Sequence, residues 1–164
     1  MITFGIDPGL HGGWAMVEDG CIVDARPFET EMVHGFKMIR VWWDVWRDYS
    51  APVIFIEEQG PQGYKTSRRS AFTIGGNFYL LLDALRHRDS IVVSPKVWQN
   101  VILPKKATQN EDTKSRAFRA IQGVKGAELL IRTKRGGKEY WHDGLVDAAC
   151  IALYGEMVRE KGGE

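Results

Sequence analysis

The sequence predicts an α/β domain in which a mixed sheet is covered by helices on both faces. Three observations indicate this class. The first 23 residues contain short apolar runs separated by turn residues, which is typical of antiparallel strands. A continuous apolar run, Val53–Ile56, is typical of a strand buried on both faces. Strand and helix patterns alternate after it, which places helices on both sides of the sheet.

The first three strands form a meander. Ile2–Ile6 has apolar residues at alternate positions and ends at the turn sequence Asp7-Pro8-Gly9. Two further apolar runs, Trp14–Val17 and Cys21–Val23, flank Glu18-Asp19-Gly20, which is a hairpin signal. We therefore expect three antiparallel strands at the start of the chain.

The rest of the framework follows from apolar spacing and from turn residues. A helix is predicted over Met32–Tyr49, ended by Pro52, and a polar loop over Gly60–Ser70 follows the buried strand. The other elements are expected, in chain order, as a helix over Ser70–Leu85, a strand over Ile91–Val93, a helical turn from Ser94, a helix over Asp112–Ile121, a short apolar segment over Glu128–Ile131, a basic loop over Thr133–Glu139 and a helix over His142–Met157.

Length and composition exclude several classes. The 164 residues, 44% of them hydrophobic, fit one domain over residues 1–164 with a proper core, ending in a polar tail from about residue 158. No apolar run approaches the ~20 residues of a membrane helix, and the N-terminus lacks a signal-peptide pattern. Two cysteines are too few for a disulfide framework or a cysteine zinc site. We expect a cytoplasmic protein with no membrane partner and no small-molecule cofactor.

Charge is divided unevenly along the chain. Residues 1–60 carry four basic and ten acidic side chains, a net charge of −6. Residues 61–138 carry sixteen basic and five acidic side chains, a net charge of +11. A strongly basic central segment favours contact with a polyanion.

Four carboxylates lie where burial makes them costly. Asp7 and Glu57 end apolar strands, and Asp143 and Asp147 are four residues apart, so this pair projects from one face of the last helix. A divalent metal would offset the gathered negative charge, because hard cations take oxygen ligands. Two such metals can activate a water and stabilise the leaving oxygen in phosphodiester cleavage. The alternatives are that Asp7 only forms a turn and that the helical pair is a solvated helix end.

Several segments, taken in order, carry a family resemblance. Gly5-Ile6-Asp7-Pro8-Gly9, Ile56-Glu57-Glu58-Gln59 and His142–Ala152 together resemble the RuvC-type Holliday junction resolvases, and most of all their phage and prophage relatives. The resemblance covers residues 2 to about 155. Its further matching segments are Phe72-Thr73-Ile74-Gly75, Val93-Ser94-Pro95-Lys96-Val97-Trp98 and Thr113-Lys114-Ser115.

The resemblance implies a ribonuclease H-like fold, which has a five-stranded mixed sheet flanked by helices. It also implies a homodimer, two Mg²⁺ or Mn²⁺ ions per active site, and paired symmetric nicks across a four-way DNA junction. Asp7, Glu57 and Asp147 match the family's acidic ligands, and Asp143 supplies the fourth. The bacterial enzymes place that fourth acid three residues before the last one, where this chain has Gly144.

Two ligand positions have alternatives. Neighbouring strand residues face opposite ways, so only one of Glu57 and Glu58 can enter the site. Matching the Ile-Glu pair favours Glu57, which we choose, whereas matching the Glu-Gln pair favours Glu58. His142 is a further candidate ligand beside Asp143.

Basic side chains are the candidates for DNA contact, and a solvated surface charge is the alternative for each. Lys65, Arg68 and Arg69 follow the Glu57 strand, and Tyr64 lies where the resemblance implies an aromatic that stacks on an unpaired base. Lys114 could approach the scissile phosphate. The other residues expected to bind phosphate, with strong salt dependence, are Lys105, Lys106, Arg132, Lys134, Arg135 and Lys138.

The chain is therefore predicted to be a metal-dependent, structure-selective DNA endonuclease that resolves four-way junctions in recombination and repair. Three alternatives stay open: a broader debranching nuclease acting on forks and flaps, a ribonuclease H acting on RNA–DNA hybrids, and a junction-binding protein that does not cut. The clustered carboxylates argue against the last, because a phosphate binder gains nothing from gathered negative charge.

Overall fold

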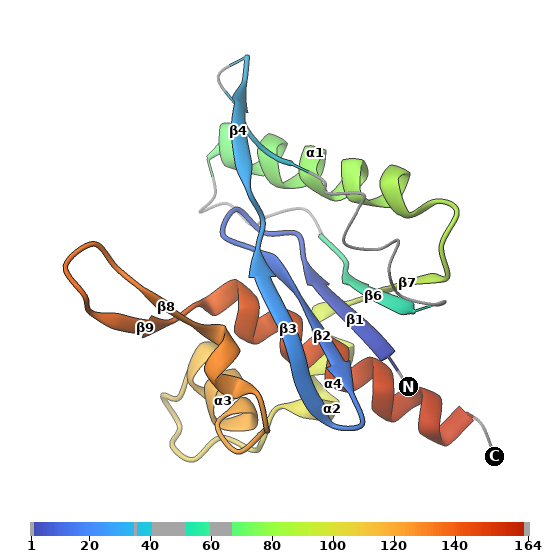
Figure 1. Ribbon diagram of the computed structural model, residues 1–164, viewed down its shortest axis with the longest axis vertical. Coiled ribbons are helices and arrows are strands. Elements are labelled where there is room, and N and C mark those ends of the chain that lie inside the picture. Colours follow the sequence, from blue (N-terminus) through green and yellow to red (C-terminus); the bar gives the residue numbers. More distant parts are fainter. Residues whose placement is uncertain (1, 35, 41–51, 60–66, 163–164) are drawn as a thin grey trace.

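A five-stranded sheet forms the centre of the molecule (Figure 1). The structure is a computed structural model and describes residues 2–34, 36–40, 52–59 and 67–162. In spatial order the strands are β3 (Cys21–Pro27), β2 (Gly13–Glu18), β1 (Ile2–Asp7), β6 (Val53–Glu57) and β7 (Ser90–Val93). The first three pair antiparallel, whereas β6 is parallel to both β1 and β7. The predicted mixed sheet, with its opening meander, is confirmed.

Helices cover both faces of this sheet, as predicted (Figure 1). On one face lies α1 (Arg68–Leu85), and on the other lies α4 (Asp143–Gly162), with α2 (Pro95–Ile102) and α3 (Thr113–Ile121) packed beside it. Alternate strand residues serve the two faces. In β6, Ile54 and Ile56 join the core under α1, while Val53 and Phe55 join the core under α4.

The packing of α4 positions the candidate site. Its fully buried side chains include three alanines, Ala148, Ala149 and Ala152, so the helix backbone can lie close to the sheet. Among the described elements, α4 packs most extensively against β1. The first turns of α4, which carry two of the candidate acids, therefore lie beside the end of the strand that carries Asp7.

The helix predicted over Met32–Tyr49 is wrong for its first part. The structure instead has an antiparallel hairpin of β4 (Thr30–Val33) and β5 (Phe36–Ile39). The physical reason is tertiary: Ile39 is buried, and its N–H donates to Oδ1 of Asn77 in α1 at 3.0 Å, a partner that lies outside any local helix. Residues 41–51 lie outside the described residues.

Smaller differences concern the ends of elements. Helix α1 begins at Arg68, because the Ser67 hydroxyl accepts a 3.1 Å hydrogen bond from the Ser70 N–H. Instead of one apolar segment and one basic loop, the chain forms a 3₁₀ helix (Ala127–Leu130) and a hairpin of β8 (Ile131–Thr133) and β9 (Glu139–Trp141). Helix α4 continues through the predicted polar tail as far as Gly162. No helix in the described ranges has the length and apolar composition needed to cross a membrane.

Candidate active site

Asp7 lies at the end of the central strand β1. The Gly9 N–H donates to its Oδ1 at 2.9 Å, so the residue does form the turn expected of Asp-Pro-Gly. Burial raises the pKa of Asp7 to about 6, although the Gly9 hydrogen bond and the positive charge of Lys114 oppose the rise. Asp7 therefore forms a turn and also interacts electrostatically with Lys114, a residue distant in the sequence.

Glu57 lies at the end of β6, the parallel neighbour of β1, so both carboxylates reach the same edge of the sheet. The buried Trp98 indole donates from Nε1 to Oε1 at 3.0 Å, and Gln59 donates from Nε2 to Oε2 at 3.2 Å. Burial and the negative charge of Asp7 raise the pKa of Glu57 to about 7. Glu58 points elsewhere: its side chain is exposed, while its N–H donates to the Val93 carbonyl at 2.8 Å.

Helix α4 brings the other two acids to this edge. The pKa of Asp147 is raised to about 8. Burial is the main cause, and the negative charges of Asp7, Glu57 and Asp143 add to it. Asp143 itself is exposed and forms an ion pair with the Lys114 ammonium. Three half-buried carboxylates therefore repel one another at the end of two parallel strands, and the fourth is paired with a lysine from α3.

Gly144 explains the spacing of the helical pair. A Cβ at this position would lie 2.2 Å from the carbonyl oxygen of His11 and 2.7 Å from the Cα of Gly12. Real Cβ atoms essentially never approach backbone that closely, so no side chain fits there. The loop after β1 therefore excludes an acidic side chain three residues before Asp147. The preceding residue on the same helical turn, Asp143, supplies the acid instead.

His142 has a local structural role. Its Nδ1 accepts a 3.3 Å hydrogen bond from the Leu145 N–H, and its own N–H donates to the Leu130 carbonyl at 3.0 Å. Burial and the nearby charge of Arg132 lower the pKa of His142. The ring therefore caps the start of α4, with one nitrogen engaged by the helix backbone.

Lys114 links α3 to the acids of α4. Its hydrogen bond to Asp143 is the main cause of its raised pKa, and the charges of Asp143, Asp147 and Asp112 add to it. The Lys114 side chain is 69% exposed. A cation in this position remains accessible to a ligand while offsetting part of the charge of the acids.

A cavity of about 460 Å³ opens beside Lys114 and the helical acids. It has apolar walls and a charged rim, and two of its walls, Phe118 and Trp141, meet edge to face with ring centroids 4.6 Å apart. The residues that line it are Glu111, Lys114, Ser115, Ala117, Phe118, Arg119, Trp141, Asp143, Val146 and Asp147.

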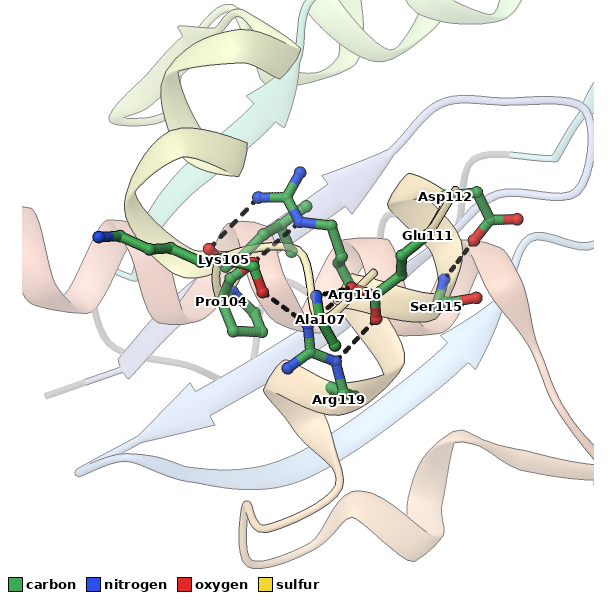
Figure 2. Close-up of polar contacts among 9 residues, drawn as sticks. Pro104, Lys105, Ala107, Glu111, Asp112, Ser115, Arg116 and Arg119 are labelled. Atoms are coloured by element: carbon green, nitrogen blue, oxygen red, sulfur yellow. Dashed lines mark hydrogen bonds and ion pairs between the residues drawn. The ribbon is translucent and has the colours of Figure 1, made fainter. Parts of the chain in front are cut away.

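The loop between α2 and α3 carries two of the predicted DNA-binding lysines, Lys105 and Lys106, both exposed. Figure 2 shows how α3 fixes this loop: Arg116 donates from Nε to the Pro104 carbonyl at 2.9 Å, and Arg119 donates to the Lys105 carbonyl at 2.8 Å. Arg119 also holds Glu111, at 2.8 and 2.9 Å. These contacts fix the backbone at Pro104 and Lys105, and both lysine side chains are exposed, with the Lys106 Nζ donating to the Gln109 carbonyl at 3.5 Å.

Four predicted DNA-contacting residues cannot be placed against this site. Tyr64 and Lys65 lie outside the described residues. Arg68 and Arg69 form the first turn of α1, but their side chains also lie outside the described part of the structure.

The donor set fits a divalent metal by its chemistry. Asp7, Glu57 and Asp147 offer hard oxygen ligands, and their pKa values are raised mainly because burial disfavours the charged carboxylates, a cost that a bound cation would offset. Within the described ranges, no three acidic, His or Cys side chains converge closely enough to hold one ion together as they stand. A bound metal would therefore draw these carboxylates closer.

Two solved structures are similar to this chain over nearly its whole length. Thermus thermophilus RuvC in complex with a Holliday junction substrate aligns with a TM-score of 0.59 and 18% identity, covering 99% of this chain and 97% of that chain. A second Thermus thermophilus RuvC structure aligns with a TM-score of 0.57, 18% identity and the same coverage. No protein-family model and no curated protein sequence matches the chain significantly. The likeness establishes the fold, and the predicted ribonuclease H-like class is confirmed.

Sequence reasoning missed three neighbours of the acids. Trp98 and Gln59 hold the two oxygens of Glu57, and Trp141 lines the cavity beside Asp143. The Val93–Trp98 segment already resembled the resolvase family, which was the available signal for Trp98. Gln59 likewise lies in the Ile56–Gln59 segment that resembles the family, whereas nothing in the local pattern around Trp141 distinguishes it from an ordinary surface residue.

Proposed function

We propose that the protein is a metal-dependent, structure-selective DNA endonuclease that resolves four-way junctions by paired symmetric nicks. One observation carries the proposal: Asp7 and Glu57, at the ends of two adjacent parallel strands, and Asp147, on helix α4, form a cluster of half-buried carboxylates beside an accessible lysine. Gathered carboxylates are the ligands suited to the divalent ions that catalyse phosphodiester hydrolysis. The fold is shared with a RuvC structure determined with a Holliday junction substrate, which supports branched DNA as the substrate class.

Asp7, Glu57, Asp143 and Asp147 would hold the ions, two Mg²⁺ or Mn²⁺ per site. When bound, divalent ions lower the pKa of a water and stabilise the leaving 3′-oxygen. Trp98 and Gln59 orient Glu57, so that its carboxylate keeps one geometry as charge in the site changes. Asp143 has to exchange its Lys114 partner before it can act as a ligand.

Once released from Asp143, the Lys114 ammonium can bind a non-bridging oxygen of the scissile phosphate. Its exposed position on α3 keeps the ammonium available for this contact. A cation aimed at developing negative charge stabilises the transition state more than the ground state.

The wider DNA contacts belong to the same proposal. Lys105 and Lys106 would bind phosphates from the fixed α2–α3 loop, and Lys65, Arg68 and Arg69 would bind them from the segment before α1, with Tyr64 stacking on an unpaired base. Two symmetric nicks require two sites, so the active form would be a homodimer working in the cytoplasm of a bacterial or phage-infected cell.

Cleavage of an end-labelled, immobile four-way junction tests the proposal. The assay is run with Mg²⁺, with Mn²⁺ and with chelator, beside linear duplex, fork, flap and RNA–DNA hybrid controls. We expect paired, symmetric, metal-dependent nicks in the junction. Equal cutting of forks and flaps would favour a broader debranching nuclease, and cutting of the hybrid alone would favour a ribonuclease H. Tight junction binding without cleavage in either metal would overturn the nuclease assignment and leave a junction-binding protein.

A further inference from the structure

The β8–β9 hairpin stands apart from the central sheet. Its two strands pair only with each other, and Figure 1 shows the hairpin projecting away from the body of the molecule on the side where α4 begins. An element with so little packing against the core adds little to folding stability, so a surface role is the better explanation for it.

The root of the hairpin is fixed by Arg132. Its guanidinium donates to the carbonyl oxygens of Leu129 and Ile131, both at 2.7 Å, and to the Ala25 carbonyl of β3 at 2.8 Å. This arginine ties the hairpin to the edge strand of the sheet. Because backbone carbonyl groups accept hydrogen bonds from the Arg132 guanidinium, Arg132 is a structural residue and not a candidate for phosphate binding.

The tip of the hairpin is ordered by its turn. The Gly137 N–H donates to the Lys134 carbonyl, and the Lys134 N–H donates to the Lys138 carbonyl. Gly136 and Gly137 have φ values of 108° and 83°, which L side chains rarely adopt, so the glycine pair is needed for this turn.

Three charged side chains stand on that ordered tip. Lys134, Arg135 and Lys138 are exposed, and none of them forms an ion pair with a carboxylate in the part of the chain that the structure describes. The Lys134 ammonium nitrogen lies 4.9 Å from the centroid of the Tyr140 ring, so this side chain is held against β9. The tip thus presents three positive charges and no large apolar side chain, a surface suited to phosphates and not to a hydrophobic protein interface or a lipid core.

The hairpin is joined directly to the candidate active site. Strand β9 ends at Trp141, which lines the cavity, and α4 begins two residues later at Asp143. Trp141 follows Arg135 by six residues, through the turn and β9, so the two lie at most about 20 Å apart. At about 3.4 Å per base pair, this equals roughly six base pairs of duplex.

We infer that Lys134, Arg135 and Lys138 bind the phosphate backbone of a duplex arm, up to about six base pairs from the cleaved phosphate. The inference rests on the proposed function and adds to it a second DNA-binding surface, rigidly linked to the acid that begins α4. The hairpin fixes the direction of one arm relative to the active site. Because the contacts are to phosphate, they carry no base specificity.

The test compares two triple variants. In one, Lys134, Arg135 and Lys138 are changed to Ala. The matched control changes Arg88, Lys125 and Lys161 to Ala, which removes the same charge from exposed positions elsewhere, Lys161 lying about 27 Å along α4 from Asp143. Junction affinity is measured at several salt concentrations with catalytic acids intact and chelator present. We expect the tip variant to bind about tenfold more weakly and to lose about three units of salt slope, and the control to retain both values.

Hydroxyl-radical footprinting locates the contact. Wild-type protein should protect the backbone of one arm out to about six base pairs from the nick, and the tip variant should lose only that outer protection. The single change Arg135→Glu, which leaves the turn intact, should weaken binding in the same direction.

Three results would overturn the inference. The first is an unchanged affinity and salt slope in the tip variant, and the second is an equal loss of affinity in the control variant. The third is failure of wild-type protein to bind any branched DNA, which would overturn the proposed function as well. Wild-type cleavage and binding in the same assay therefore separate failure of the hairpin inference from failure of the nuclease proposal.

Discussion

The indole of Trp98 donates a 3.0 Å hydrogen bond to Oε1 of Glu57, across 41 residues of sequence. Trp98 is 1% exposed, so this donor has no access to water and the hydrogen bond cannot be exchanged for a solvent one. The contact holds one oxygen of the carboxylate at the end of β6. It also lowers the pKa of Glu57 and so limits the rise that burial causes.

Trp98→Phe removes this donor and keeps most of the packed ring. We expect the pKa of Glu57 to rise above about 7, because a hydrogen bond to the charged form is lost. Cleavage should then fall about fivefold near pH 7 and recover toward pH 9, as expected when a pKa of about 7 rises by about one unit. A pH–rate profile checks this, and an unchanged profile would show that Trp98 serves only the core.

Asp7→Asn and Asp147→Asn should each abolish metal-dependent cleavage while junction binding is kept. Each change removes a charged oxygen ligand and preserves side-chain volume. The matched control is Asp83→Asn, an exposed acid on α1 paired with Arg86, which should leave cleavage unchanged. Cleavage retained by either site variant would contradict the assignment of these acids.

Lys114→Ala should slow cleavage of bound junction by about 10²-fold, the loss typical of one donor to a developing oxyanion. Lys114→Arg should retain more activity, because the positive charge remains. Lys125→Ala serves as a control for the loss of one exposed lysine. Single-turnover rates at saturating protein separate this effect from weaker binding, and a normal rate in Lys114→Ala would restrict Lys114 to its ion pair with Asp143.

Two glycine substitutions should act in opposite directions. Gly144→Ala places a methyl group 2.2 Å from the His11 carbonyl, so we expect it to destabilise the fold by about 2 kcal/mol or more and to displace the acids of α4. Gly75→Ala lies in α1 with nothing within 4 Å of the added Cβ, so it should stabilise by about 0.5–1 kcal/mol. Chemical denaturation measures both, and a stabilising Gly144→Ala would refute the close approach of α4 to the loop after β1.

The apo protein should lose stability as pH rises through the titration of the acid cluster. Asp7, Glu57 and Asp147 have pKa values raised to about 6, 7 and 8. Between about pH 4 and pH 8 the folded state therefore binds more protons than the unfolded state, and stability falls with pH. His142, whose pKa is lowered, acts in the opposite direction, so a difference between variants is the clearer measurement.

In chelator at pH 8, Asp147→Asn should melt about 2–4 °C above wild type, and at pH 5 this gain should vanish. Adding Mg²⁺ should raise the melting temperature of wild type at pH 8 and have little effect at pH 5, where the ligands are protonated. Thermal unfolding at the two pH values, with and without metal, checks this. A wild-type protein as stable as Asp147→Asn at pH 8 in chelator would contradict the mutual repulsion of the acids.

Local patterns in the sequence were sufficient to predict the sheet strands and to select the candidate acids. Apolar runs of strand length, each closed by a turn residue or a carboxylate, are local signals, and they correctly predicted the opening meander, β6 and β7. The pair Asp143 and Asp147 was visible for the same reason, since helical spacing alone places both on one face. Their proximity to Asp7 followed from the resemblance, and the contribution of the Asp7 charge to the raised pKa of Asp147 agrees with it.

How these elements meet depends on contacts between segments that are distant in the sequence. The β4–β5 hairpin replaces a predicted helix because Asn77, 38 residues away, takes the Ile39 N–H. The partners of the acids also come from distant segments: Lys114 reaches Asp143 across 29 residues, as Trp98 reaches Glu57. Gly144 is visible in the sequence, but the reason for it is not. The backbone that excludes a side chain at this position belongs to the loop after β1. Hydrophobic periodicity predicts which side chains of a segment are buried. Which residues pack against them is determined only when the whole chain is folded.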